Sequence, residues 1–299
     1  KGTGLASFHH RYPDRFFDVG IAEQHAVTFA GGLAAGGLKP VVAIYSTFMQ
    51  RAVDQVIHDV ALQHLPVVFA LDRAGPVPDD GETHQGLYDI SLLRPVPGIS
   101  ILAPASVHEM NAMMDWSLQQ DHPVVIRYPK GACPTEEAAF SLPLEKGRGV
   151  FVHRDGTDTL IVCTGGMYGE VHEACNILAR AGTPADCYLL RFIKPVDERH
   201  FLQACSAYRN IVIVEDGIQT GGIAQALASL LRSRRSDVRT AVLAFGELFY
   251  PQGSRRDILA SAGLSSAHIS DAVRLLESGA ALSELEAVLN PGLGSVQFL

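Results

Sequence analysis

The chain has 299 residues, 47% hydrophobic and 19% charged, so it is long enough for two globular domains and too apolar to be intrinsically disordered. Its formal net charge of -8 argues against a general nucleic-acid-binding surface, which requires basic side chains. The five cysteines show no CxxC spacing, which is typical of reduced thiols in a cytosol rather than of a disulfide framework or a zinc site. We recognise neither a signal peptide nor an apolar segment long enough for a membrane helix, and therefore expect a cytoplasmic protein that does not contact membranes.

Glu23 is the first residue along the chain that suggests chemistry. It lies between an apolar run at 15–21, which resembles a strand, and a helix of small apolar residues predicted at 26–36. No lysine or arginine lies within several positions, so a buried carboxylate here would need a proton or a distant partner. An acid at the start of a helix also commonly does no more than cap that helix, and the local pattern alone favours that interpretation.

The first half of the chain then alternates apolar, β-rich runs with helical patterns. Strands are predicted at 41–45, 66–71, 99–103 and 123–128, and helices at 48–63 and 106–119. Nearly continuous apolar strands separated by helices indicate a parallel sheet that is covered on both faces.

A polar, proline-containing stretch at 130–149 interrupts this alternation, which restarts after it. Strands are predicted at 159–164, 185–192, 211–215 and 238–245, helices at 170–181, 197–204, 222–232, 257–262 and 266–277, and one short helical run in the tail from 284. The sequence therefore predicts an α/β protein of two domains, each a mostly parallel sheet flanked by helices. We assign residues 1–135 to the first domain, 136–155 to a linker and 156–299 to the second domain.

Polar side chains follow the strand ends of the first domain, where open parallel sheets bind their ligands. The runs at 45–51, 72–75 and 127–131 each follow a strand, and the second of them opens a long loop that reaches residue 86. Phe48 could stack on a ligand, although such residues are more often core. Lys130 could hold a phosphate together with Arg73 and Arg127, although a lone lysine here could equally be a linker charge.

The sequence does not indicate several other chemistries. The histidines lack the short spacings of zinc sites, and there is no Gly-x-Ser-x-Gly elbow, no Walker loop and no dinucleotide fingerprint. We therefore expect no metal ligands within this chain.

Several motifs together resemble the 1-deoxy-D-xylulose-5-phosphate synthases, thiamine-diphosphate-dependent enzymes of the transketolase superfamily. The resemblance spans most of the chain and is carried by the runs 18–25, 45–55, 72–75, 80–86, 127–131, 191–197 and 214–217 with Gly221-Gly222. It implies a transketolase-like pyrimidine-binding domain followed by a transketolase C-terminal domain.

The resemblance also implies roles for residues around the cofactor. Glu23 would be catalytic, hydrogen-bonding the N1′ atom of the aminopyrimidine and so favouring the tautomer that activates the cofactor. Phe48 would stack on the pyrimidine, Ile21 would line the same pocket, and Arg51 would help to hold the ring.

Substrate residues follow from the same resemblance. Tyr45, Asp80 and His84 match positions that line the substrate channel, and His84 is also a candidate for handling a proton or an acceptor hydroxyl. Arg73 and Lys130 match positions that meet the phosphate of the acceptor. Lys130 departs from the arginine expected there, and a lysine keeps the charge but loses bidentate geometry.

The implied reaction condenses pyruvate with glyceraldehyde 3-phosphate, releasing CO2 and giving 1-deoxy-D-xylulose 5-phosphate, a precursor for isoprenoid and thiamine biosynthesis. The family holds the cofactor diphosphate and Mg²⁺ through a Gly-Asp-Gly…Asn motif in an N-terminal domain, and this sequence does not contain that motif. We therefore expect thiamine diphosphate and Mg²⁺ to be held mainly by a diphosphate-binding domain on the same or a separate chain. We also expect a homodimer, and no turnover by these residues alone.

Three alternatives remain open from the sequence. The chain could be the C-terminal subunit of a split transketolase, or the beta chain of the decarboxylating component of a 2-oxo acid dehydrogenase. It could also be a non-catalytic interaction subunit with the same fold, although the presence of Glu23 and Phe48 argues against that.

Overall fold

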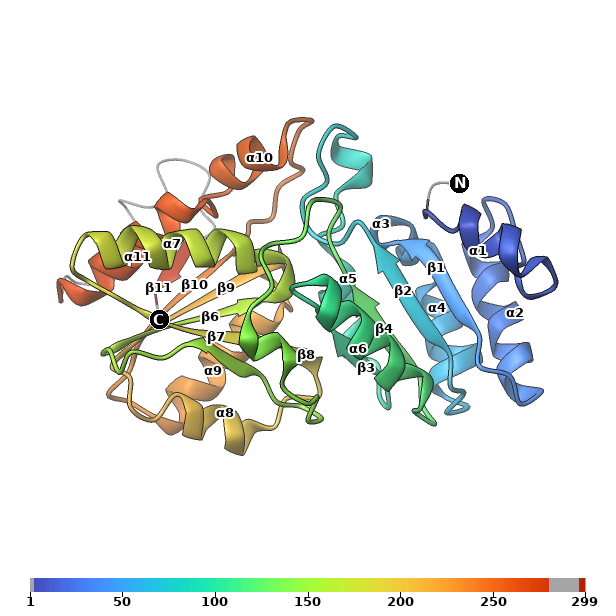
Figure 1. Cartoon of the computed structure of the whole chain (residues 1–299), viewed down its shortest axis with the longest axis horizontal. Coiled ribbons are helices and arrows are strands. Elements are labelled where there is room, and N and C mark those ends of the chain that lie inside the picture. Colours follow the sequence, from blue (N-terminus) through green and yellow to red (C-terminus); the bar gives the residue numbers. More distant parts are fainter. Residues whose placement is uncertain (1–2, 280–295, 299) are drawn as a thin grey trace.

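The computed structural model describes residues 3–279 and 296–298 and forms two α/β domains that lie side by side (Figure 1). The first sheet has the order β1-β2-β4-β3-β8 and the second the order β11-β10-β9-β6-β7-β5. The predicted architecture of two mostly parallel sheets flanked by helices is confirmed. Within the described ranges, no helix has the length and apolar character needed to cross a membrane.

The first sheet is parallel except at one edge. β1 (Val41–Tyr45), β2 (Val68–Asp72), β3 (Ser100–Leu102) and β4 (Val124–Arg127) run in the same direction, and each lies where the sequence predicts a strand. The helices of this domain are α1 (Ala6–Arg11), α2 (Glu23–Ala35), α3 (Ser46–Met49), α4 (Val53–Gln55), α5 (Asp89–Leu93) and α6 (Val107–Leu118). One helix was predicted at 48–63, and it is divided into α3, a 3-10 turn, α4 and a π-helical segment at 56–61.

Successive side chains of a central strand in the first sheet pack against helices on opposite faces of that sheet. In β2, Phe69 and Leu71 join the core that contains residues of α2, whereas Val68 packs with Met113 of α6. Successive strand residues point to opposite faces, so a strand buried on both sides is apolar throughout.

The second domain has its own sheet and two helical layers (Figure 1). Its strands are β5 (Val150–His153), β6 (Thr159–Thr164), β7 (Asp186–Leu190), β9 (Asn210–Ile218), β10 (Arg239–Phe245) and β11 (Val296–Phe298), with β5 and β11 antiparallel to their neighbours. The helices α7 (Tyr168–Arg180), α10 (Arg255–Ser261) and α11 (Ser266–Glu277) lie above the sheet in Figure 1, and α8 (Glu198–Ala204) and α9 (Ile223–Arg234) below it.

The predicted strand at 15–21 is wrong. Residues 13–15 form a 3-10 turn and the following residues, up to α2, lie outside any strand. Gly20 has a φ of +65°, which interrupts extended backbone, and Ile21 is 89% exposed. The apolar composition of this run therefore reflects exposed apolar surface rather than a buried strand, and Glu23 opens α2 without a preceding strand.

The strand predicted at 185–192 is divided between the two sheets. β7 ends at Leu190, and β8 (Phe192–Lys194) pairs antiparallel with β3 in the first sheet. Arg191 lies between them, 1% exposed, and its Nε donates to Glu109 Oε1 at 2.6 Å. The same guanidinium donates to the carbonyls of residues 139, 140, 142 and 143. A buried arginine with a full set of acceptors thus fixes the crossover between the domains.

β5 falls inside the range assigned to the linker, 136–155, and it pairs with β7 in the second sheet. The helical run predicted in the tail lies outside the described residues. Beyond it, residues 296–298 are described, and they form β11.

Candidate functional site

Glu23 is a buried acid whose partner comes from elsewhere in the chain. It is the first residue of α2 and is 8% exposed. Arg51, on the turn that continues α3, donates from Nη1 to Glu23 Oε1 at 3.1 Å. Among the described residues, no group donates to the second carboxylate oxygen of Glu23, so that oxygen is available to a ligand.

Aromatic rings surround this pair. Phe48 lies with its ring centroid 4.7 Å from the guanidinium carbon of Arg51, 5.6 Å from the Tyr45 ring and 5.4 Å from the His84 ring. The sequence places these residues on β1, α3 and the loop after β2, and the structure brings all of them to the carboxyl ends of β1 and β2. Phe48 therefore lies at the centre of this group, with Arg51 over its ring, the Tyr45 ring stacked against it and the His84 ring at its edge.

A second cluster of charge lies beside the aromatic rings. Arg73 stands 4.0 Å above the Tyr45 ring and donates to Asp80 Oδ2 at 2.5 Å, while Lys130 Nζ donates to the same oxygen at 3.2 Å. Burial opposes ionisation of Asp80. The hydrogen bond and charge of Lys130, with the charges of Arg73 and His84, nevertheless hold the pKa of this carboxyl below its usual value. The two cations therefore share one acid, which a phosphate could displace.

His84 is held by its own turn rather than by an acid. Its Nδ1 lies 2.9 Å from Thr83 Oγ1, and the Thr83 carbonyl accepts a bond from Thr47 Oγ1 at 3.1 Å. The bond from Thr47 ties the 3-10 turn at 82–84 to the start of α3, and the His84 ring packs against Phe48 in a T-shaped contact.

Arg127 is not a phosphate-binding residue, contrary to the prediction. It is 2% exposed, and it donates from Nε to Asp89 Oδ2 at 2.8 Å and from Nη1 to Asp216 Oδ1 at 2.7 Å. Thr164 also donates to Asp216 Oδ1 at 2.7 Å. Because β4 and β9 belong to different sheets, this ion pair joins the two domains at the ends of their strands. Burial keeps Arg127 from an incoming ligand, although its Nη2 has no hydrogen-bond partner among the described residues.

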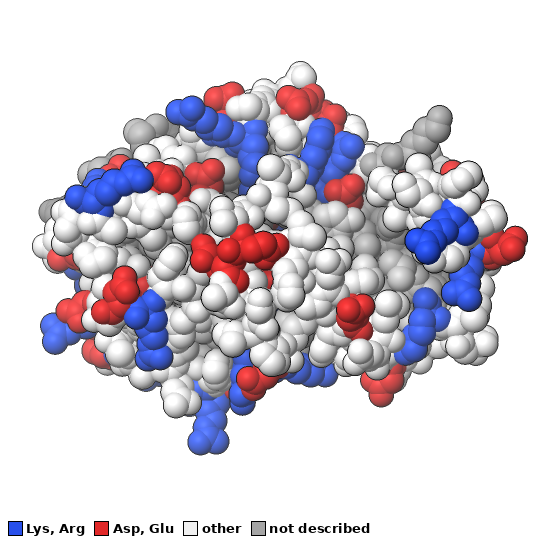
Figure 2. Space-filling model, in the orientation of Figure 1, with Lys and Arg blue, Asp and Glu red and all other residues white. Residues whose placement is uncertain are grey.

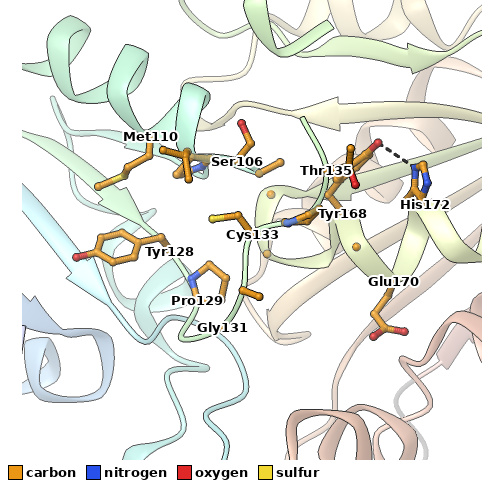
Figure 3. A pocket seen from close by; sticks show the side chains of 18 of the residues that line it. Ser106, Met110, Tyr128, Pro129, Gly131, Cys133, Thr135, Tyr168, Glu170 and His172 are labelled. Carbon is orange, nitrogen blue, oxygen red and sulfur yellow. Dashed lines mark hydrogen bonds between the residues drawn. The ribbon is translucent and has the colours of Figure 1, made fainter. Parts of the chain in front are cut away.

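A cavity of about 600 Å³ opens between the domains and is lined from both sides (Figure 3). Ser106, Met110 and Tyr128 contribute from the first domain and Tyr168 and His172 from the second. Lys130 is also in the lining, whereas Glu23 and Phe48 are not. The cavity therefore adjoins the Asp80 cluster and is distinct from the Glu23 pocket.

Acidic and basic side chains are interspersed on the surface drawn in Figure 2. Side chains of both charges lie along the upper edge, where α10 and the loop after β2 are found in Figure 1, and a further acidic group lies near the middle. Positive charge beside Asp80 comes from Arg73 and Lys130, and these two cations favour an anionic ligand there despite the net charge of -8.

Sequence reasoning missed two arrangements that depend on distant residues. The pairing of Glu23 with Arg51 joins positions on α2 and the turn after α3. Glu137, His153 and His172 also converge, with one ligand atom from each within 4.8 Å of the others. Their separations in the chain match no short metal-binding motif, so only the fold could reveal them.

Comparisons with known families agree with the fold. Residues 1–135 match the family described as transketolase, pyrimidine binding domain, and residues 148–269 match transketolase, C-terminal domain.

Relatives of known activity resemble most of this chain. The 1-deoxy-D-xylulose-5-phosphate synthase of Treponema pallidum is 62% identical over 269 residues, which cover 90% of this chain and 43% of that protein. The synthase of Desulforudis audaxviator is 42% identical over 282 residues, covering 93% of this chain and 44% of that protein. The chain therefore spans less than half the length of these relatives.

Solved structures share the fold at low sequence identity. A structure titled "Split gene transketolase, inactive beta4 tetramer" superposes with a TM-score of 0.79 at 24% identity, covering 92% of this chain and 88% of that one. The transketolase of Campylobacter jejuni superposes with a TM-score of 0.69 at 17% identity, covering 87% of this chain and 39% of its own. These structures share the fold. The two matching domain families show that the chain consists of a transketolase pyrimidine-binding domain and a transketolase C-terminal domain, and it is homologous to the C-terminal portion of 1-deoxy-D-xylulose-5-phosphate synthases.

Proposed function

We propose that this chain supplies the pyrimidine-activating half of a thiamine-diphosphate-dependent active site that condenses pyruvate with glyceraldehyde 3-phosphate. The product would be 1-deoxy-D-xylulose 5-phosphate, formed with release of CO2 in the cytoplasm. The observation that carries the proposal is the 62% identity to a synthase over 269 residues, which cover 90% of this chain.

The residues at the carboxyl ends of β1 and β2 fit the pyrimidine half of the cofactor. A buried carboxylate with one unpaired oxygen suits a ring nitrogen that must be protonated, and an aromatic face suits the ring itself. The bound cofactor would supply the electron sink for decarboxylation. Glu23 would hold the proton at that ring nitrogen, Phe48 would orient the ring, and Arg51 would keep the carboxylate in place.

The acceptor would bind beside this pocket. Arg73 and Lys130 would exchange their shared bond to Asp80 for the phosphate of glyceraldehyde 3-phosphate. His84 would then lie between the phosphate cluster and the pyrimidine pocket, within reach of an acceptor hydroxyl. Asp80 and Tyr45 would position the two cations when no phosphate is bound.

The remaining half of the site would come from a diphosphate-binding domain on the same or a separate chain. Magnesium requires phosphate oxygens and one or two carboxylates, and we expect that domain to provide them. Ile21 would contact the cofactor only once such a partner covers it, because its side chain is 89% exposed. The match to the structure titled "Split gene transketolase, inactive beta4 tetramer" covers 88% of the chain in that structure. Its title gives a precedent for a chain of this fold that is inactive by itself. We further propose that the complete protein is a homodimer.

Two measurements test the proposal. The isolated chain with thiamine diphosphate, Mg²⁺ and pyruvate is expected to release no CO2, and measurable release without another polypeptide would refute the half-site proposal. In the complete protein, Glu23→Gln is expected to abolish formation of 1-deoxy-D-xylulose 5-phosphate, with His58→Gln, an exposed position, as the matched control. Unchanged turnover in the Glu23 variant would favour a non-catalytic interaction role.

The alternative enzyme activities are distinguished by the substrates that give a product. Each activity is assayed with its own substrates. Product from pyruvate and an aldehyde phosphate would indicate a synthase, and product from a ketose phosphate donor would indicate a split transketolase. Transfer from pyruvate to a lipoyl acceptor would indicate the beta chain of a 2-oxo acid dehydrogenase component. We expect product only with the first pair, because the high identity to the synthases covers the loop that carries Asp80 and His84.

A further inference from the structure

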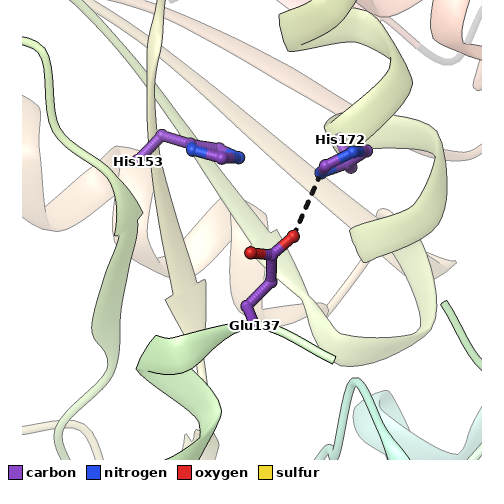
Figure 4. A group of neighbouring side chains, drawn as sticks. All are labelled: Glu137, His153 and His172. Carbon is purple, nitrogen blue, oxygen red and sulfur yellow. Dashed lines mark ion pairs between the residues drawn. The ribbon is translucent and has the colours of Figure 1, made fainter. Parts of the chain in front are cut away.

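We propose that Glu137, His153 and His172 bind a divalent transition-metal ion, with Zn²⁺ as the first candidate, at a site distinct from the cofactor pocket. The three residues come from three separate segments. Glu137 immediately precedes the 3-10 turn at 138–141, His153 ends the edge strand β5, and His172 lies in the first half of α7. Figure 4 shows both imidazole rings and the carboxylate directed toward a common space.

The distances are close to those of a metal site. Glu137 Oε1 and His172 Nδ1 are 3.6 Å apart, and one ligand atom from each of the three residues lies within 4.8 Å of the others. A tetrahedral Zn²⁺ with bonds of about 2.0–2.2 Å holds its ligand atoms roughly 3.3–3.6 Å apart. The pair of Glu137 and His172 already has this separation, and a rotation about the side-chain bonds of His153 would bring its ring nitrogen to the ion.

The chemistry of the ligands selects the class of ion. Two imidazoles and one carboxylate suit Zn²⁺ and similar transition ions, whereas Mg²⁺ prefers oxygen ligands only. The site therefore differs in kind from the magnesium site expected for the cofactor, and it draws all its protein ligands from the described part of this chain.

The surroundings support the carboxylate and leave room for an additional ligand. Tyr168, which is buried, donates its hydroxyl to Glu137 Oε1 at 2.9 Å, the kind of outer-shell bond that orients metal ligands. The same hydroxyl lies 3.1 Å from His172 Nδ1, and an ion bound to that nitrogen would replace this contact. Glu137, Tyr168 and His172 also line the cavity of about 600 Å³ between the domains. Three protein ligands with the remaining position open to a cavity form an arrangement that accepts water or a small ligand.

The proposed ion would fasten the segment that connects the domains. Glu137 belongs to the polar stretch after β4, whereas β5 and α7 belong to the second sheet and its helical layer. A bound ion would therefore restrict the position of residues 133–137, which form one wall of the cavity.

Zn²⁺ binding to the metal-free chain, measured by isothermal titration calorimetry after treatment with a chelator, tests the proposal. We expect one ion per chain with micromolar affinity or tighter, no competition from millimolar Mg²⁺, and a higher Tm in the presence of Zn²⁺. His153→Gln and His172→Gln are each expected to weaken binding at least tenfold, since even loss of an outer-shell partner typically has that effect. Glu137→Gln should also weaken it, while retaining the acceptor for the Tyr168 hydroxyl.

Matched controls separate this site from adventitious binding. Adjacent histidines and an exposed cysteine can bind Zn²⁺, so the variants His9→Gln/His10→Gln and Cys133→Ser should leave the affinity unchanged. Each variant must keep the Tm of the starting chain when EDTA is present, which shows that it folds. Co²⁺ should give the strong visible absorption of a tetrahedral site, and this absorption should disappear in His172→Gln. The proposal is overturned if Zn²⁺ does not bind, if the His153 and His172 variants bind as tightly as the unchanged chain, or if only the controls lose binding.

Discussion

Replacing Arg127 by methionine should strongly destabilise this chain, because it leaves two buried acids without their partner. The side chains of Arg127, Asp89 and Asp216 are 1%, 2% and 0% exposed, and the guanidinium donates to both carboxylates. Removing one member of a buried ion pair typically costs about 3–5 kcal/mol, because the remaining charge has no water to solvate it. Thr164 would still donate one bond to Asp216, so we expect the loss to lie within this range rather than above it.

The loss should also depend on pH in a defined direction. Burial opposes ionisation of Asp216, but the charge and hydrogen bond of Arg127, with the bond from Thr164, hold the pKa of Asp216 below its ordinary value of 3.8. A lowered pKa contributes stability that is present above the unfolded-state pKa and is lost as pH falls through the folded-state pKa. The variant lacks this contribution, and its buried acids can take up protons. The difference between the two proteins should therefore be greatest near pH 7 and shrink as pH falls below about 5.

Urea unfolding measures this difference. The single tryptophan, Trp116, lies on α6 with its ring 5.2 Å from Phe192 of β8, and its fluorescence can be compared with far-UV circular dichroism to test for a single transition. Arg232→Met, at an exposed position on α9, is the matched control and should change stability by less than about 0.5 kcal/mol. A loss below about 1 kcal/mol at pH 7, or a loss that grows toward acid pH, would refute the argument.

Three further predictions concern separate features. In the complete protein, Lys130→Ala should raise the KM for the phosphorylated acceptor about tenfold or more with little change in kcat, and Lys130→Arg should restore it, because a charged hydrogen bond contributes about 1.5–3 kcal/mol. Burial raises the pKa of Glu215 to about 7, so stability should fall as pH rises toward 7, and Glu215→Gln should flatten that profile in urea unfolding; an unchanged profile would contradict this. A Cβ on Gly166 would lie 2.0 Å from Asp216 Oδ2, so Gly166→Ala should destabilise the fold by about 1–3 kcal/mol, whereas Gly32→Ala, which meets open space, should not; equal Tm values would exclude the clash.

The sequence predicted those elements whose apolar pattern is local. The strands at 41–45 and 159–164 match β1 and β6 residue for residue, because both are short runs of β-branched and apolar residues bounded by turns. The run at 15–21 has apolar residues as well but also contains Arg15, Asp18 and Gly20, and the structure gives it no neighbouring strand to pair with. Likewise, the split between β7 and β8 depends on the acceptors that surround Arg191, which come from distant residues.

The candidate site shows the same division. Its residues could be listed from the sequence because strand ends of a parallel sheet meet at one edge, and the structure brings Tyr45, Phe48 and His84 together there. The direction of each side chain could not be predicted. Arg127 ends β4, as a ligand-binding residue would, yet it turns into the buried space between the domains, where Asp216 meets it.

The contrast between two ion pairs leads to a prediction about assembly. The pair of Arg127 and Asp216 is wholly buried, whereas Arg51 is 45% exposed in its pair with Glu23, and such partly exposed pairs contribute only about 0–1 kcal/mol. Arg51 therefore holds Glu23 only weakly while this end of the sheet remains open to water. A covering domain would remove water from Glu23 and from the exposed Ile21, and so strengthen any hydrogen bond that the carboxylate makes to the cofactor.

Cofactor binding and association with the diphosphate-binding domain should then be coupled, and the coupling must be equal in both directions. With the two parts prepared as separate chains, thiamine diphosphate and Mg²⁺ should tighten their association about fivefold or more. Glu23→Gln should remove most of that gain while leaving cofactor-free association unchanged, because the amide cannot hold the ring proton as a carboxylate does. If cofactor tightens association equally in the variant, the contact that couples the two events lies outside the Glu23 pocket.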